Sequence, residues 1–337
     1  MRGYWFLASV ALVASAAPAK PPSPPTPLFA SDAPISVTLR GPMASLASNR
    51  AENPRPAMMT VDGVSYPITL APRGITRKAS DVCNFPPLRV ELTRPAPPGS
   101  LFEHQHRIKL VTFCKRPAEF QQKVLLEYAG YRLYNLMTPQ SFRVRLANID
   151  YADEAGRPYI SRVGFFLEDF SDVAKRNGMT AAKLPDTIPG SMLDPATSAR
   201  FAVFEYMISN YDWSMRAGPK GEPCCHNARL MSAVPGSQVI PVPYDFDWSG
   251  LVDAPYAGPP EGIPIQSVRQ RNYRGYCAHQ AHAAAFAKAL APRRAEFLSV
   301  FAAIPGLDAR NQRDAVDYVG RFFDDLQSGK MLKTCVR

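Results

Sequence analysis

The order of apolar and polar positions divides the chain into a strand-rich first half and a more helical second half. Short runs of β-branched and apolar residues, separated by Gly, Pro and Asn, predict strands in the first half, and Asp62-Gly63 is typical of a hairpin turn. We expect these strands to form a mainly antiparallel sheet. They are predicted at residues 35–39, 57–61, 64–70 and 87–92.

The segment 106–113 is apolar on both faces apart from Arg107 and Lys109, so it is interpreted as a central strand. Lys109 would then be partly buried, and a buried ammonium group needs an anionic partner. Glu127 could provide that partner, because it falls on the inward stripe of a helix predicted over 118–137. The alternative is that Lys109 snorkels to solvent and Glu127 lies at the edge of the stripe.

Helical spacing dominates the second half. A strand pair is first expected at 141–151 and 159–170, joined by a polar turn. The helices are predicted at residues 198–209, 281–291, 293–304 and 312–326, with Pro292 and Pro305-Gly306 as the breaks between the last three.

The N-terminus has the pattern of a secretory signal. Arg2 precedes an apolar run from Trp5 to Ala14, which is too short to span a bilayer and is followed by small residues. We therefore expect residues 1–19 to be a cleaved signal peptide, and the protein to be secreted or periplasmic, without a membrane span. The proline-rich residues 20–32 favour an extended backbone and are interpreted as a tether.

Six cysteines in an exported chain indicate disulfide bonds. Cys83 and Cys114 flank strands of the first half, so they are the expected local pair. Cys224 or Cys225 could reach Cys277. A zinc site built on Cys224, Cys225 and His226 is the alternative, but adjacent cysteines lack the usual ligand spacing and no second cluster completes it.

Composition and charge narrow the class of protein. A hydrophobic fraction of 46% in 337 residues is enough for a large core. The net charge of +10 favours an anionic partner such as a nucleotide, a phosphopeptide or an anionic envelope polymer. No nucleic-acid-binding motif accompanies this charge, so nucleic acid is not expected as a partner.

The stretch VIPVPYDFDWSG carries the clearest candidate chemistry. Asp245 and Asp247 are two residues apart, so in an extended backbone both carboxylates would project from one face. Two adjacent carboxylates repel unless a cation lies between them, and paired hard oxygen ligands suit Mg²⁺ or Mn²⁺. The alternative is a turn in which one Asp caps a helix and the other is solvated.

Two further segments precede this one, ISNYDWSM with Asp212 and CCHNARLM with Asn227. The three segments in this order resemble the CotH-like spore-coat protein kinase family. The resemblance implies that Asp212 is the catalytic base, that Asn227 is a metal ligand, and that Asp245, with Asp247, is the metal-binding acid. His226, next to Asn227, is expected to anchor the loop.

The same resemblance implies an α+β, bilobal kinase-like fold. Residues 33–170 would form an antiparallel, β-rich N-terminal lobe with one long helix, and residues 171–337 a largely helical C-terminal lobe. In such a fold Lys109 and Glu127 pair to position the nucleotide phosphates. The loop that contains Arg77 would cover the nucleotide, and residues 166–169 would form the hinge that contacts the adenine.

The expected function is phosphoryl transfer from ATP, with Mg²⁺ or Mn²⁺, to a protein or other envelope hydroxyl acceptor. Two alternatives stay open. ATP is scarce outside the inner membrane, which favours an inactive pseudokinase-type module that binds an anionic ligand in its basic cleft. A carboxylate-pair glycan hydrolase acting through Asp212 and Asp245 is the other.

Overall fold

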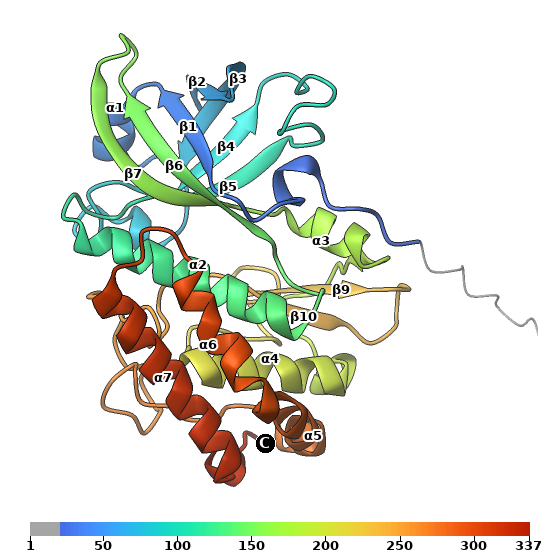
Figure 1. Ribbon diagram of the computed structural model, residues 1–337. Coiled ribbons are helices and arrows are strands. Elements are labelled where there is room, and N and C mark those ends of the chain that lie inside the picture. The colour runs from blue at the N-terminus through green and yellow to red at the C-terminus, as the bar shows by residue number, and fades with distance from the viewer. Residues whose placement is uncertain (1–20) are drawn as a thin grey trace, which may run out of the picture.

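The computed structural model describes residues 21–337, so the expected signal peptide lies outside the described residues (Figure 1). A closed β-barrel occupies the first half of this region, and most of the helices lie beneath it. The long helix α2 (Glu119–Met137) lies between the barrel and these other helices. Among the described residues, no helix is both long and apolar enough to cross a membrane.

Seven strands form the barrel, and α1 (Met43–Ser48) lies between the first two of them in the chain. The expected hairpin is present, because Asp62 and Gly63 have positive φ angles of 48° and 76° and join β2 directly to β3. In order around the barrel the strands are β1 (Ile35–Arg40), β2 (Arg55–Val61), β3 (Val64–Pro72), β4 (Leu88–Leu92), β5 (Arg107–Val111), β7 (Pro158–Leu167) and β6 (Val144–Ala152).

The expected bilobal kinase-like fold, with an antiparallel N-terminal lobe and a largely helical C-terminal lobe, is wrong. β1 pairs in parallel with β6, with Ile35 opposite Ala147, and this pairing closes the strands into a mixed barrel. The second half also contains a three-stranded sheet and a long stretch, residues 244–276, without helix or strand. Local patterns could not predict the closure, because it joins segments more than a hundred residues apart.

The three-stranded sheet has the order β10-β9-β8, and all of its strands pair antiparallel. Its strands are β8 (Thr180–Ala181), β9 (Ala228–Ser232) and β10 (Ile240–Pro243). The helices around it are α3 (Phe170–Arg176), α4 (Pro195–Ile208), α5 (Gln280–Leu290), α6 (Arg294–Ala302) and α7 (Ala309–Gln327).

Each helix predicted from apolar spacing is present within a few residues of its expected bounds. Asp194 caps α4 by accepting the Thr197 backbone N–H at 2.8 Å, so α4 begins at Pro195. A large apolar cluster joins α2, α4 and the segment that follows β10, with Tyr131 and Phe204 packed against the buried ring of Phe246. This cluster holds the candidate site segments against the helices.

The proline-rich segment, interpreted above as a tether, contacts the folded body. The backbone N–H of Ser23 donates to the Lys175 carbonyl at 3.2 Å. Leu28 and Phe29, in a short 3₁₀ turn, are buried in the core of the barrel.

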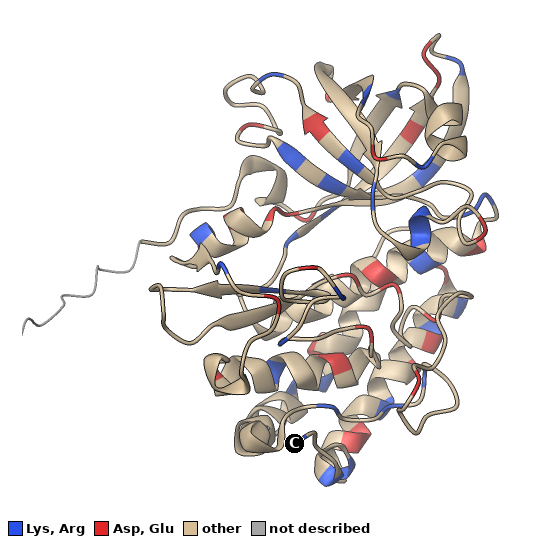
Figure 2. Cartoon of the chain, turned by 180° about the vertical axis from the view of Figure 1, so that it is seen from behind, with Lys and Arg blue, Asp and Glu red and all other residues tan. Residues whose placement is uncertain are grey.

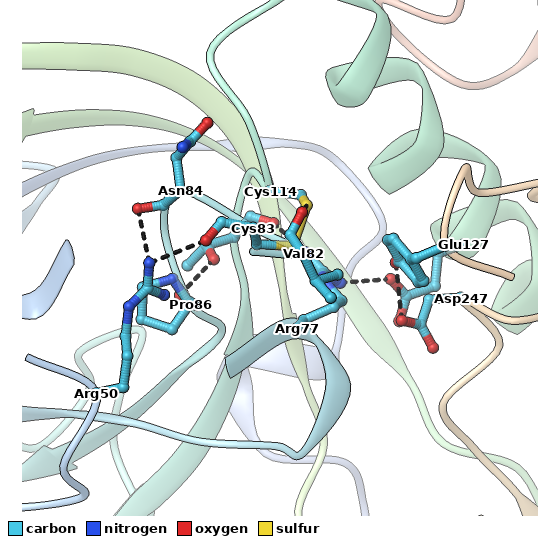
Figure 3. Close-up of a disulfide and its surroundings, with 11 residues drawn as sticks. Arg50, Arg77, Val82, Cys83, Asn84, Pro86, Cys114, Glu127 and Asp247 are labelled. Carbon is cyan, nitrogen blue, oxygen red and sulfur yellow. Dashed lines mark hydrogen bonds and ion pairs between the residues drawn. A yellow bond between two sulfur atoms is a disulfide. The ribbon is translucent and has the colours of Figure 1, made fainter. Parts of the chain in front are cut away.

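All six cysteines are paired. The expected Cys83–Cys114 disulfide is present and is drawn in Figure 3. The expected link from the 224–225 pair to Cys277 is wrong, because Cys277 pairs with Cys335 and the two adjacent cysteines pair with each other. Backbone bonding explains the choice, since the Cys277 N–H donates to the Val336 carbonyl at 2.8 Å and holds the C-terminus beside it.

Candidate functional site

Asp212 lies in a tight turn that follows α4. The helix ends at Ile208, and its C-cap residue Ser209 adopts the left-handed conformation with φ 53°. Oδ1 of the Asn210 side chain then accepts the backbone N–H of Asp212 at 3.1 Å. The backbone carbonyl of Asn210 accepts the indole N–H of Trp213 at 2.9 Å. These bonds fix the direction in which the Asp212 side chain leaves the helix.

The Asp212 carboxylate lies between His226 and Asn227. Its Oδ1 is 2.7 Å from Nε2 of His226, and its Oδ2 accepts from Nδ2 of Asn227 at 3.0 Å. The hydrogen bond to Asp212 raises the pKa of His226 above its usual value, although partial burial opposes this. The structure therefore brings the predicted base and one predicted metal ligand into direct contact.

Sequence reasoning did not predict the contact between His226 and Asp212. The only signal for it was that His226 precedes Asn227, which the motif already placed near Asp212. In the structure Ser214 and His226 form an isolated antiparallel bridge, and this bridge brings the imidazole to the carboxylate. His226 is thus part of the site as well as part of the loop.

Asp245 and Asp247 do not share one face of an extended strand. β10 ends at Pro243, and Asp245 has a left-handed φ of 68°, so the chain turns between the two carboxylates. The backbone N–H of Asp245 donates to the Tyr131 hydroxyl at 2.9 Å, which holds this turn against α2. Asp247 is buried and accepts the Tyr256 hydroxyl at 2.9 Å.

Burial raises the pKa of Asp247 to about 7, and the negative charge of Asp245 adds to this effect, whereas Arg77 and the bond from Tyr256 oppose it. The two carboxyl groups therefore differ in environment, because Asp245 is only partly buried. A divalent cation would compete with the proton for Asp247.

The expected pair of Lys109 with Glu127 is wrong. Glu127 pairs instead with Arg77, whose Nη1 is 3.1 Å from Oε2, and both side chains are buried (Figure 3). Arg77 also donates to the Thr112 carbonyl at 2.5 Å. Burial raises the pKa of Glu127 well above its usual range, against the lowering effect of Arg77. Glu127 still lies beside the candidate site, because Glu127, Arg77 and Asp247 line the same small cavity.

Lys109 contacts Tyr244 and not Glu127. Its Nζ is 4.6 Å from the centre of the Tyr244 ring, a cation–π contact, and Arg229 lies 5.5 Å from the same ring. Burial, together with the positive charges of Arg73 and Arg229, lowers the pKa of Lys109 to about 7. Lys109 makes no salt bridge within the described residues.

Lys109 lines a pocket of about 470 Å³ between the barrel, the start of α3 and the small sheet. Its acidic side chains are Glu168 and Asp169, and Glu168 is already paired with Arg176 at 2.9 Å. Figure 2 shows several basic positions on the barrel strands and several acidic positions in the loops beneath. The basic residues that line the pocket are Arg73, Arg89, Arg107, Lys109 and Arg229.

The expected hinge, residues 166–169, lies at this pocket, because Leu167, Glu168 and Asp169 all line it. The pocket and the Asp212 turn are joined through Tyr244, whose backbone N–H donates to the Asn227 carbonyl at 3.1 Å. A basic pocket therefore adjoins a group of acidic and amide side chains.

Among residues 21–337, no three His, Cys, Asp or Glu side chains gather as a metal cluster. A magnesium ion needs few protein ligands, because it keeps several waters and binds substrate phosphates. Nδ2 of Asn227 donates a hydrogen bond to Asp212, so the side-chain oxygen of Asn227 remains available to bind a cation. Asp245 provides a second hard oxygen donor, so these residue types suit Mg²⁺ or Mn²⁺.

No protein-family model matches this chain, and no curated protein matches it either. The resemblance to the CotH-like family, and the roles that it assigns to individual residues, therefore stay predictions.

Proposed function

We propose that this protein transfers the terminal phosphoryl group of ATP to a hydroxyl acceptor with the help of Mg²⁺ or Mn²⁺. The observation that carries the proposal is the position of Asp212, which is held by His226 and Asn227. Tyr244 links this group to the basic pocket, because its backbone bonds to Asn227 and its ring contacts Lys109. Phosphoryl transfer needs this combination, because one acid must accept the acceptor proton while cations hold the phosphates.

In the proposed reaction the pocket binds the nucleotide. Lys109, Arg73 and Arg229 face the phosphates, and their positive charges attract the polyanion. When bound, the metal ion would supply charge neutralisation at the phosphate oxygens. Asn227 and Asp245 would hold that ion, with Asp247 behind them.

Asp212 would orient the acceptor hydroxyl and accept its proton. Its carboxylate is partly exposed, at 38%, so an acceptor can reach it. The contacts with His226 and Asn227 hold its two carboxylate oxygens in a fixed orientation. Arg77 and Glu127 are buried behind the site and hold the loop that follows β3 against α2.

Three disulfides in one chain are typical of an oxidising compartment, which supports action outside the cytoplasm. The acceptor is accordingly proposed to be a protein or other hydroxyl-bearing molecule of the envelope or the exterior.

The test uses purified protein with ATP and Mn²⁺. Calorimetry measures nucleotide binding, and transfer of labelled phosphate to the protein itself and to hydroxyl acceptors measures the reaction. Asp212→Asn should keep the ATP affinity within a few-fold, because Asp212 contacts the acceptor, while transfer falls by about two to four powers of ten. The matched control is Asp317→Asn, an exposed Asp on α7, which should change neither quantity.

Persistent transfer in the Asp212→Asn variant would show that another group accepts the proton. The basic pocket specifically favours a second function, the binding of an anionic ligand without chemistry. Nucleotide binding by the parent protein without transfer to any acceptor would favour that function and refute the proposed reaction.

A further inference from the structure

α4 contains a buried carboxyl group that the proposed reaction does not use. Glu205 is 1% exposed and lies among apolar residues of the helix, between Phe204 and Tyr206. Neither of its Oε atoms has a hydrogen-bond partner of good geometry within the described residues. Burial raises the pKa of Glu205 well above its usual value.

The side-chain amide of Asn210 is a second buried polar group at this end of α4. Three of the four polar atoms of Asn210 have clear partners: the backbone N–H donates to the Glu205 carbonyl at 2.9 Å, Oδ1 accepts the Asp212 N–H, and the carbonyl accepts Trp213 Nε1. Nδ2 alone has none of good geometry, and Asn210 is 2% exposed.

The two groups complement each other. A carboxyl group has oxygens that accept, and the Asn210 amide has an N–H that needs an acceptor. The two residues are joined at the end of α4, because the Glu205 backbone carbonyl accepts the Asn210 backbone N–H at 2.9 Å, and the Asn210 side chain lowers the pKa of Glu205 against the effect of burial. The negative charge of Asp212 raises the pKa of Glu205, so Glu205 is influenced by both Asn210 and Asp212.

We propose that Glu205 is a positioning residue, which accepts the Asn210 amide and so fixes the turn that aims Asp212 at the acceptor. The inference rests on the proposed function of Asp212. A leucine at this position would suit the apolar surroundings better, so an acid that is buried here at a cost in stability is better explained by a role in accepting the Asn210 amide, which also lacks a partner within the described residues.

The experiment compares Glu205→Leu with Glu205→Gln. Leucine removes the acceptor, whereas glutamine restores a carbonyl of the same reach in a neutral side chain. In Glu205→Leu we expect kcat for phosphate transfer to fall by about tenfold or more, with the ATP dissociation constant within about twofold of the parent, because only the acceptor side is disturbed. Glu205→Gln should recover kcat to within about threefold.

A second measurement does not depend on phosphate transfer. The Trp213 indole N–H donates to Asn210, so its NMR signal and its exchange with water report on the turn. We expect faster exchange in Glu205→Leu and parent-like exchange in Glu205→Gln. The signal is assigned with Trp213→Phe.

Unchanged kcat and unchanged indole exchange in Glu205→Leu would overturn the inference, as would a Glu205→Gln variant that is as impaired as Glu205→Leu. If the parent transfers no phosphate, the proposed function fails, but the indole exchange still tests the role of Glu205. If Glu205→Leu does not fold, Asn210→Ser serves instead: it keeps an acceptor for the Asp212 N–H and loses the amide, so it should speed indole exchange equally in the parent and in Glu205→Gln.

Discussion

Lys109→Met should stabilise the protein without ligand, and the gain should depend on pH. In the folded chain the pKa of Lys109 is lowered from its ordinary 10.5 to about 7, because the ammonium is buried near Arg73 and Arg229. At low pH the folded state must hold a buried charge that the unfolded state hydrates freely. Each tenfold difference in acid dissociation corresponds to about 1.36 kcal/mol, so the full cost is about 5 kcal/mol.

The direction of the pH dependence of stability follows from the number of protons that the folded and unfolded states bind. Between the two pKa values the unfolded chain keeps the Lys109 proton and the folded chain loses it, so the stability of the parent rises with pH in that window. The variant has no such group. Its advantage over the parent should therefore shrink by about 2 to 3 kcal/mol between about pH 6 and about pH 9.

The assay is urea unfolding of both proteins at the two pH values without nucleotide. Lys288→Met, a change at an exposed position on α5, is the matched control and should show no pH-dependent gain. An equal difference in unfolding free energy at both pH values would refute the reasoning. The same variant should weaken ATP binding, and in the parent that binding should weaken as pH rises above about 7, because Lys109 then loses its charge.

Three further predictions concern the metal, the buried ion pair and the disulfides. Asp245→Ala should abolish the stabilisation by Mn²⁺ that is seen in thermal unfolding with nucleotide, since only binding to the folded state raises the midpoint; an unchanged shift would argue against Asp245 as a ligand. Arg77→Met should lower the unfolding free energy by about 3 to 5 kcal/mol, because Glu127 is left buried without its cation, and the Arg77→Met/Glu127→Gln double variant should lose less; additive losses in urea unfolding would contradict the coupling. Mass spectrometry of the unreduced protein should show no free thiol and a peptide that joins Cys277 to Cys335, and any other partner for Cys277 would contradict the structure.

Local patterns in the sequence were sufficient to predict most of the individual strands and helices. The alternation of apolar residues predicted the barrel strands, the Asp62-Gly63 turn predicted the β2–β3 hairpin, and the helical stripe predicted α2. These features depend on residues close together in the chain, which is why periodicity finds them. The order of the three motifs also placed Asp212 and Asn227 in one site.

Tertiary structure alone decided how these elements pair. The parallel pairing of β1 with β6 closes a mixed barrel, and no local signal specifies a partner so distant in the chain. Glu127 pairs with Arg77 instead of Lys109, because the chain after β3 brings the guanidinium to α2 while Lys109 faces Tyr244. Sequence therefore determined which groups carry charge, and the packing of distant segments decided which charges meet.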